Sequence, residues 1–143
     1  MGDSIIEALQ KYFLGCPLIS DGRLGVDYLP EHGVAYSLDT TPASEIIQQY
    51  IDGGSLRQYL FVFRSAKDYG PDTLQNMANS GLFEALAAWM ERQTRARNLP
   101  VLPEGLLPRR IEAQSTGYLF TSSPDTGKYQ IQCRLIYYRK GGR

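Results

Sequence analysis

The fold is decided by residues 44 to 65, which read Ser-Glu-Ile-Ile-Gln-Gln-Tyr-Ile-Asp-Gly-Gly-Ser-Leu-Arg-Gln-Tyr-Leu-Phe-Val-Phe-Arg-Ser. Gly53-Gly54 can form a two-residue turn, because both residues tolerate a positive φ, and the flanking segments then pair as a long β-hairpin. This hairpin carries apolar side chains on both faces, so it has to be covered on both sides. One cover can be helices of the same chain, and the other can be a second molecule.

The two-residue turn also predicts the register of the hairpin. Ile51 should lie opposite Leu56, and Tyr50 opposite Arg57. One face then gathers aromatic and arginine side chains, which are common anchors of protein interfaces. The candidate interface residues are Tyr50, Arg57, Tyr59, Phe61 and Phe63. The alternative is that the long helix expected over 72–96 covers them. Residues 45 to 51 also fit a helix face, and we favour the strand.

The segment before the hairpin predicts one helix and two short strands. Ser4 and Glu7 have the spacing of a capping box, and apolar residues then recur at helical intervals, which predicts a helix over 5–14. Apolar and polar residues alternate around 24–28 and again over 34–40, which is typical of half-buried strands.

The segment after the hairpin predicts a long helix and a second β unit. Pro71 suits a first helical turn, and an apolar stripe continues to about residue 96, with Asn79-Ser80-Gly81 as its weak point. Residues 98–108 contain three prolines and predict a loop or an extended arm. A turn over 122–127 and clean alternation after it predict a C-terminal hairpin, followed by a frayed tail at 140–143.

These patterns together predict an α+β fold in a single domain, residues 1–143. We expect a mixed, mostly antiparallel sheet built from hairpins, flanked by a short N-terminal helix and one long helix.

Composition narrows the function classes. Fifteen Lys and Arg balance fifteen Asp and Glu, so the formal net charge is zero, whereas dedicated nucleic-acid binders usually show a basic excess. Neither a signal peptide nor an apolar run of about 20 residues occurs, so we expect a protein made in a cytoplasm, without a membrane partner. Cys16 and Cys133 predict two buried free thiols, with a disulfide as the alternative.

Recognisable catalytic equipment is absent from the sequence. The single histidine, His32, lies beside a turn glycine. The sequence has neither a GxSxG nucleophile motif nor an active-site cysteine motif with which this histidine could form a catalytic pair. One histidine and two distant cysteines are too few for a usual zinc site, and no phosphate-binding glycine motif occurs. We therefore expect no catalytic, cofactor-binding or metal-binding residues, and no enzyme.

A cluster of basic residues allows two interpretations. These side chains crowd the end of the long helix and the segment beyond it: Arg92, Arg95, Arg97, Arg109 and Arg110. They can form a solvated face that complements the helix dipole. Alternatively, they can face DNA or an acidic partner.

The chain resembles a family of tail-terminator or minor capsid proteins from long-tailed bacteriophages and prophages. The resembling blocks cover most of the chain in order: Gly22–Pro30, Tyr36–Pro42, Tyr50–Phe63, Asn76–Glu84, Ile111–Phe120 and Tyr129–Tyr138. None of these blocks is a catalytic signature, so the likeness is one of the whole chain.

The resemblance implies a virion structural protein made in the bacterial host cytoplasm. It implies a hexameric ring of this chain that ends tail-tube polymerisation, with the tail-tube protein on one side and the head–tail connector on the other. No sequence-specific nucleic acid binding is expected. The alternative role in the virion is that of a head-side neck or connector adaptor, or of another minor capsid protein. A small cytoplasmic enzyme or ligand-binding domain is the third interpretation.

Overall fold

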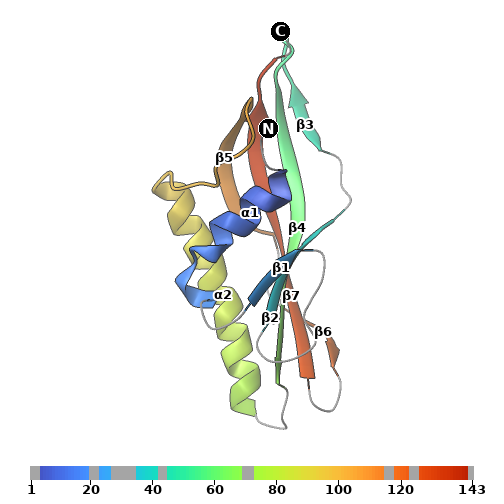
Figure 1. Ribbon diagram of the computed structural model, residues 1–143, viewed down its shortest axis with the longest axis vertical. Coiled ribbons are helices and arrows are strands. Elements are labelled where there is room, and N and C mark those ends of the chain that lie inside the picture. The colour runs from blue at the N-terminus through green and yellow to red at the C-terminus, as the bar shows by residue number, and fades with distance from the viewer. Residues whose placement is uncertain are drawn as a thin grey trace.

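The computed structural model describes residues 4–19, 23–26, 35–41, 45–68, 73–114, 118–122 and 126–141. Its elements are, in order, α1 (Ile5–Leu14), the 3-10 turn η1 (Pro17–Ile19), β1 (Arg23–Val26), β2 (Ala35–Thr40), β3 (Ile46–Gln49), β4 (Ser55–Asp68), α2 (Thr73–Arg95), β5 (Leu106–Ala113), β6 (Tyr118–Ser122) and β7 (Thr126–Arg139). The predicted α+β class is confirmed, with a short N-terminal helix and one long helix beside a mostly antiparallel sheet (Figure 1).

Two long antiparallel strands, β4 and β7, form the centre of the sheet. They pair without interruption from Ser55 opposite Arg139 to Asp68 opposite Thr126. The outer strands cover only parts of this pair, in the order β1-β2-β4-β7-β5, with β3 also on β4 and β6 also on β7. β1 joins β2 in parallel, and the other pairings are antiparallel.

The predicted hairpin of residues 44 to 65 is part of a longer antiparallel arrangement, in which β2 and β3 both pair with β4. β2 pairs with β4 from Ala35 opposite Ala66, and β3 continues along the same edge of β4. The predicted strand at 45–51 is confirmed as β3. The predicted two-residue turn is wrong, because β3 pairs Gln49 with Ser55 and leaves residues 50–54 as the loop. We call residues 50–54 the hairpin tip.

Helix α1 forms as the sequence indicates. Glu7 N–H donates to the Ser4 hydroxyl, and Ser4 N–H donates to the Glu7 carboxylate, which is a complete capping box. The helix turns Leu9 and Phe13 into the core and leaves Leu14 exposed.

Helix α2 runs unbroken through Gly81, so the weak point at residues 79–81 does not divide it into two helices. Ala96 and Arg97 end the helix. Arg97 has a φ of 61°, its N–H donates to the Thr94 carbonyl, and Asn98 N–H donates to the Gln93 carbonyl. These two bonds form a Schellman motif at the end of the helix. In this motif the position of Arg97 is usually a glycine.

Two segments predicted as irregular are more ordered than expected. β5 begins at Leu106, so Pro108 lies inside a strand, where the edge of the sheet tolerates a residue without an N–H. The start of the predicted frayed tail is held in place. Lys140 N–H donates to the Gly105 carbonyl, and Gly141 packs so closely on the hairpin tip that a side chain would collide with the Asp52 carbonyl.

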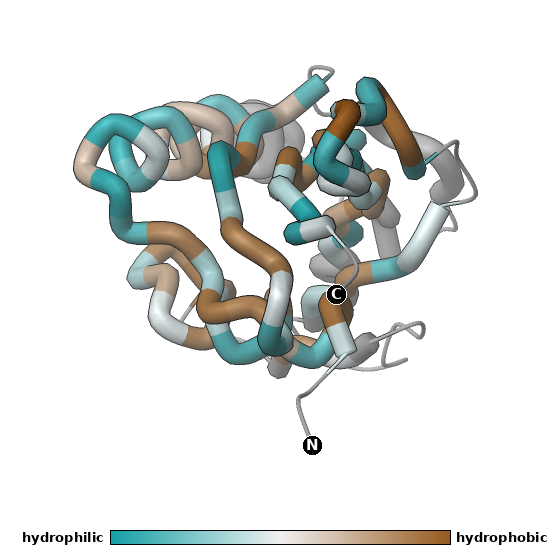
Figure 2. Tube along the Cα trace, turned by 90° about the horizontal axis from the view of Figure 1, so that it is seen from above, coloured by the Kyte–Doolittle hydropathy of each residue, from teal (hydrophilic) through white to brown (hydrophobic). Residues whose placement is uncertain are grey.

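The core lies between the helices and one face of the sheet. Seen from above, the strands lie nearly end-on and α2 lies to one side of them (Figure 2). An aromatic group occupies the centre, with the Phe13 ring centroid 5.6 Å from Trp89, 5.9 Å from Phe63 and 6.0 Å from Phe61. Cys16 and Cys133 are buried free thiols, as predicted.

The opposite face of the sheet is closed by charged side chains. Arg64 pairs with Asp39 and donates to Gln130, and Arg134 donates to Glu112 at 2.5 Å. Val62 lies among these long side chains and is nearly buried. The expectation that apolar groups on this face need a second molecule as a cover is therefore wrong for the centre of the sheet.

Candidate functional site

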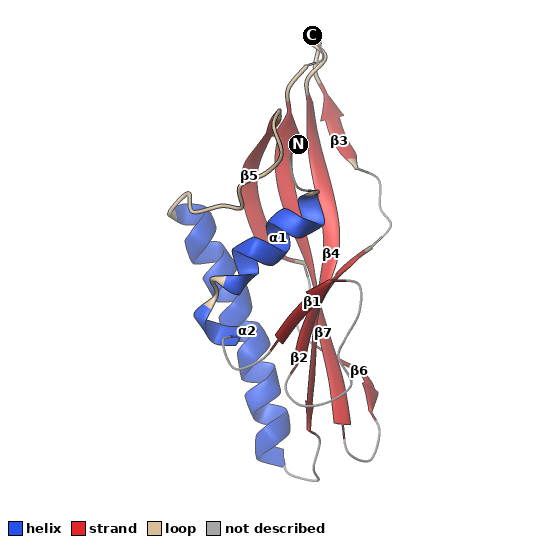
Figure 3. Cartoon of the chain, in the orientation of Figure 1, coloured by secondary structure: helices blue, strands red, loops and turns tan. Residues whose placement is uncertain are grey.

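One end of the sheet projects beyond both helices (Figure 3). It consists of β3, the hairpin tip, and the ends of β4, β5 and β7 that pair beside them. We call this part of the molecule the projecting end. Exposed large apolar side chains gather on it: Ile46, Ile47, Tyr50, Ile51 and Leu107. Hydrophobic side chains in water at one end of a molecule are typical of an interaction surface.

Strand β3 gives the projecting end an open edge. All four residues of β3 are exposed, with Ile46 at 42% and Ile47 at 44%. None of the four is charged. Within the described part of the chain, β3 pairs only with β4, so its outer backbone groups face away from the sheet.

The opposite edge of the projecting end is protected. Leu106 N–H donates to the Pro103 carbonyl, and Pro108 has no N–H. Further along β5, the Thr94 hydroxyl of α2 accepts from Ile111 N–H at 3.1 Å and donates to its carbonyl at 2.9 Å. Natural sheets blunt their edges by such means, because a bare edge pairs with other chains. β5 is blunted by a proline and by α2, whereas β3 has only its four-residue length and a register shift between Ile46 and Gln48.

The contact between Thr94 and Ile111 gives a testable prediction. Replacing Thr94 with Val keeps the shape of the side chain but leaves the N–H and C=O of buried Ile111 without their partner. The free energy of unfolding should fall by about 2 kcal/mol in urea titrations. Thr94→Ser keeps the hydroxyl and is the control. Equal losses in both variants would contradict the role of the hydroxyl.

The structure separates the five candidate interface residues. Phe61 and Phe63 are fully buried in the core, so they are corrected to core residues of the folded chain. Alternation places them on the face of Tyr59, but Phe13 of α1 and Phe83 of α2 cover that face at their positions. The ring of Phe61 thus packs on α1, and the ring of Phe63 packs on both α1 and α2, so the long helix alone is not the cover that the alternative interpretation named.

The other three candidates lie toward the projecting end. Arg57 Nη1 contacts Glu45 Oε2 at 3.1 Å and is mostly buried, and the Tyr59 hydroxyl lies 2.5 Å from Thr40 Oγ1. Tyr50 is exposed, with its ring 6.1 Å from that of Tyr138. Only Tyr50 thus offers a large surface to a partner.

The candidate basic residues do not form one patch. Arg92 and Arg97 are exposed on and just after α2. Arg95 lies 3.9 Å from Glu91 in the same helix. Arg109 covers the Tyr138 ring, with Cζ 5.6 Å from the centroid, and Arg110 contacts Glu112 at 3.3 Å. Two of the five are thus balanced by carboxylates.

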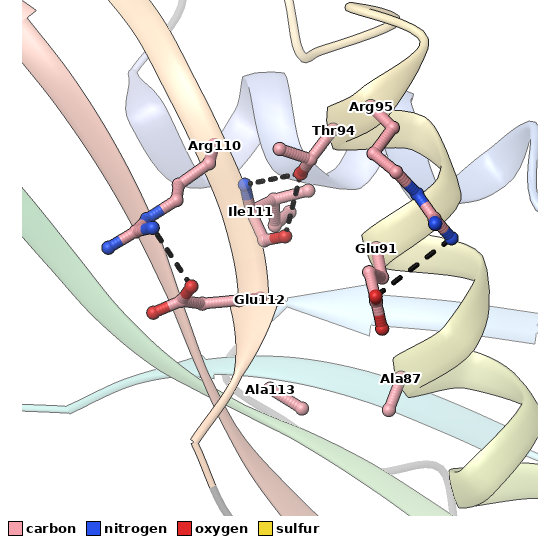
Figure 4. Close-up of a pocket in the computed structure, with 8 residues that line it drawn as sticks. All are labelled: Ala87, Glu91, Thr94, Arg95, Arg110, Ile111, Glu112 and Ala113. Carbon is pink, nitrogen blue, oxygen red and sulfur yellow. Dashed lines mark hydrogen bonds and ion pairs between the residues drawn. The ribbon is translucent and has the colours of Figure 1, made fainter.

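A groove of about 380 Å³ separates α2 from β5 (Figure 4). Ala87, Glu91 and Thr94 line the helix side, and Ile111 and Ala113 line the strand side. Arg95, Arg110 and Glu112 also line it, and Figure 4 shows the side chains of Arg110 and Glu112 on the side of β5 away from α2. Its small alanines leave the space open.

The most exposed apolar residue at the projecting end is one that the candidate list omits. Ile51 is fully exposed at the hairpin tip, next to Asp52. The assumed two-residue turn placed Ile51 in a strand opposite Leu56. A signal was available, because an uncharged Ile-Ile-Gln-Gln run before an exposed glycine turn is unusual for a solvent-facing edge.

Several other sequence predictions fall outside the described residues, among them His32 and Tyr28. Among the described residues, no group of three or more His, Cys, Asp or Glu side chains is placed to hold a metal ion. Neither described helix combines the length and the apolarity needed to cross a membrane.

Comparison with known proteins gives no family for this chain. No family model matches it, and no curated protein matches it. The resemblance to phage proteins therefore stays a prediction.

Proposed function

We propose that this chain is a structural protein of a phage virion, a tail terminator that forms a ring, caps the tail tube and joins it to the head connector. The resemblance supports a phage structural protein, since its blocks follow one another over most of the chain, and a head-side neck or connector adaptor is the alternative position in the virion. The projecting end supports the assembly, since it exposes the apolar side chains of Ile46, Ile47, Tyr50 and Ile51.

The open edge of β3 carries this proposal. An exposed and uncharged strand edge invites pairing, and soluble monomers normally protect such an edge with charges, proline, a bulge or a cover. β5 has a proline and the cover of α2, whereas β3 has neither a charge nor a proline among its four residues and is interrupted only by a register shift between Ile46 and Gln48. An open strand edge of this kind is expected where a neighbouring molecule of an assembly covers it.

The charge distribution is compatible with a ring through which DNA passes. Phosphate contacts would hold the DNA and slow its passage. The chain has no net charge, and Arg95 and Arg110 each lie beside a glutamate. The described surface thus offers no concentrated basic patch at these arginines.

The test is the absolute mass by light scattering over a wide concentration range, with electron microscopy of the same samples. We expect a mass of about six chains and ring-shaped particles. Deleting the gene from its phage should give overlong tails without heads. Virions of normal form after the deletion would overturn the proposal, and binding to portal complexes instead of tail tubes would place the chain on the head side.

A further inference from the structure

The hairpin tip contains a dipeptide that can react with itself. Asp52 is followed by Gly53, and both residues are exposed between β3 and β4 at one end of the molecule (Figure 3). Glycine has no Cβ, so the main-chain nitrogen of Gly53 has little steric cover and a flexible backbone around it. In an unfolded chain this nitrogen can attack the aspartate side chain. The contacts of the tip decide whether the reaction also occurs in the folded chain.

The reaction needs no partner other than water. The Gly53 nitrogen loses its proton and bonds to Asp52 Cγ, and this proton leaves with the hydroxyl of the protonated carboxyl group as one water molecule. The product is a five-membered succinimide ring. Water then adds to one of the two ring carbonyl carbons and breaks its bond to nitrogen. Breaking the bond at Cγ restores aspartate, whereas breaking it at the main-chain carbonyl gives isoaspartate, and nothing is oxidised or reduced.

The hydrogen bonds of the tip oppose ring closure. Gly53 N–H donates to the Tyr50 carbonyl at 3.1 Å, and a succinimide nitrogen has no proton left to donate. Asp52 Oδ1 accepts from Gly54 N–H at 2.8 Å, so the carboxylate is held by a different nitrogen from the one it would have to meet. Tyr50 N–H donates to the Gly54 carbonyl at 2.8 Å and closes the loop. Ring closure therefore has to break bonds that the folded tip keeps.

The packing of the tip leaves no room for the product. In isoaspartate the chain continues through Cβ and Cγ, and the main-chain carbonyl of Asp52 becomes a free carboxylate. Gly141 packs against this carbonyl so closely that a Cβ on Gly141 would collide with it, and the same Cβ would lie 3.1 Å from Gly54 N. On Gly54 itself, a Cβ would collide with the Tyr138 hydroxyl. The tip therefore cannot lengthen by one CH2 group and keep these contacts.

We propose that Asp52–Gly53 is an isomerisation site that the folded tip keeps unreactive, so that isoaspartate forms there only when the tip opens away from Gly141. Local openings of a folded chain have their own free energy, and the rate of the reaction then follows the open fraction. Once formed, isoaspartate prevents the tip from closing again. The inference concerns the single chain and does not depend on the proposed function.

The experiment follows isoaspartate at Asp52 in the full chain during incubation at neutral pH. Peptide mapping with electron-transfer fragmentation distinguishes isoaspartate from aspartate and assigns the position. Wild type is incubated folded and in guanidinium chloride. Asp21–Gly22 is the same dipeptide and is the internal reference in denaturant. Asp52→Glu cannot form the five-membered ring, so the signal at this position should disappear.

One glycine variant tests the packing, and another is its control. In Gly141→Ala the added Cβ meets main-chain atoms of the tip, which cannot turn aside as a side chain can. In Gly81→Ala the added Cβ meets nothing within 4 Å, so the tip stays as it is. Circular dichroism checks folding. Tyr138→Phe, which removes the hydroxyl beside Asp52, replaces Gly141→Ala if the latter does not fold.

The expected result is a rate that depends on the fold. In denaturant, Asp52 and Asp21 should isomerise at similar rates. In folded wild type, Asp52 should react at least about tenfold more slowly than in denaturant, and Gly141→Ala should react several-fold faster than Gly81→Ala. Equal rates for Asp52 in folded and denatured wild type would overturn the inference. A folded Gly141→Ala chain with the wild-type rate would overturn the part assigned to the close packing.

Discussion

Phe13→Ala should lower the free energy of unfolding by about 4 kcal/mol, which is a large part of the stability of a domain of this size. Phe13 is fully buried, and its ring contacts those of Tyr12, Phe61, Phe63 and Trp89. Truncation removes the contacts with both the sheet and α2, and leaves a cavity between three elements that cannot all close on it.

Urea titration measures this loss, and the neighbouring residue supplies the control. Leu14 is also in the last turn of α1 but is 63% exposed, so Leu14→Ala should change the free energy of unfolding by less than about 1 kcal/mol. Similar losses in both variants would mean that α1 does not pack on the sheet as described.

Alkaline pH should destabilise the protein from about pH 8 upward, more steeply than ordinary exposed groups would. Burial raises the pKa of Cys133 and Cys16, and burial also raises the pKa of Tyr12 and Tyr137. The negative charge of Glu45 adds to the increase for Tyr137.

The direction of the stability change depends on whether the folded or the unfolded state releases protons as the pH rises. Below pH 8 the thiols are protonated in both states, and stability is complete. Above this pH the thiols of the unfolded chain ionise, with a pKa of about 8.5, while the buried thiols stay protonated, so unfolding becomes more favourable. Each such group costs about 1.4 kcal/mol per pH unit until its folded-state pKa is reached, and the tyrosines add to this above about pH 10.

Urea titrations at pH 7.5, 9 and 10.5 in a reducing buffer measure the effect. Cys133→Ala removes one of the titrating groups and should reduce the slope of stability against pH, whatever its effect at pH 7.5. An unchanged slope in this variant would contradict the burial of the Cys133 thiol.

The elements that sequence predicted well are those defined by local chemistry. The capping box of Ser4 and Glu7 marks the start of α1, and alternation marks β4 and β7. In each case the signal lies within a few residues, so no distant part of the chain needs to be known.

The details that sequence missed depend on distant contacts. Gly53-Gly54 favours a two-residue turn, yet the close packing of Gly141 and the Tyr138 ring on residues 50–54 goes with a longer loop. Likewise, alternation assigns Phe61 and Tyr59 to one face, but only the position of α1 decides that Phe61 is core. The groove has no local signal, because its walls come from segments that pack together only in the folded chain.

The uninterrupted pairing of β4 with β7 has a mechanical consequence. Both strands run along the long axis of the molecule, and their hydrogen bonds lie across it (Figure 1). A pull between the hairpin tip and the far end of the sheet would load these bonds in shear and at the same time, instead of opening them one after another. A chain built in this way can transmit tension from one end to the other with little extension.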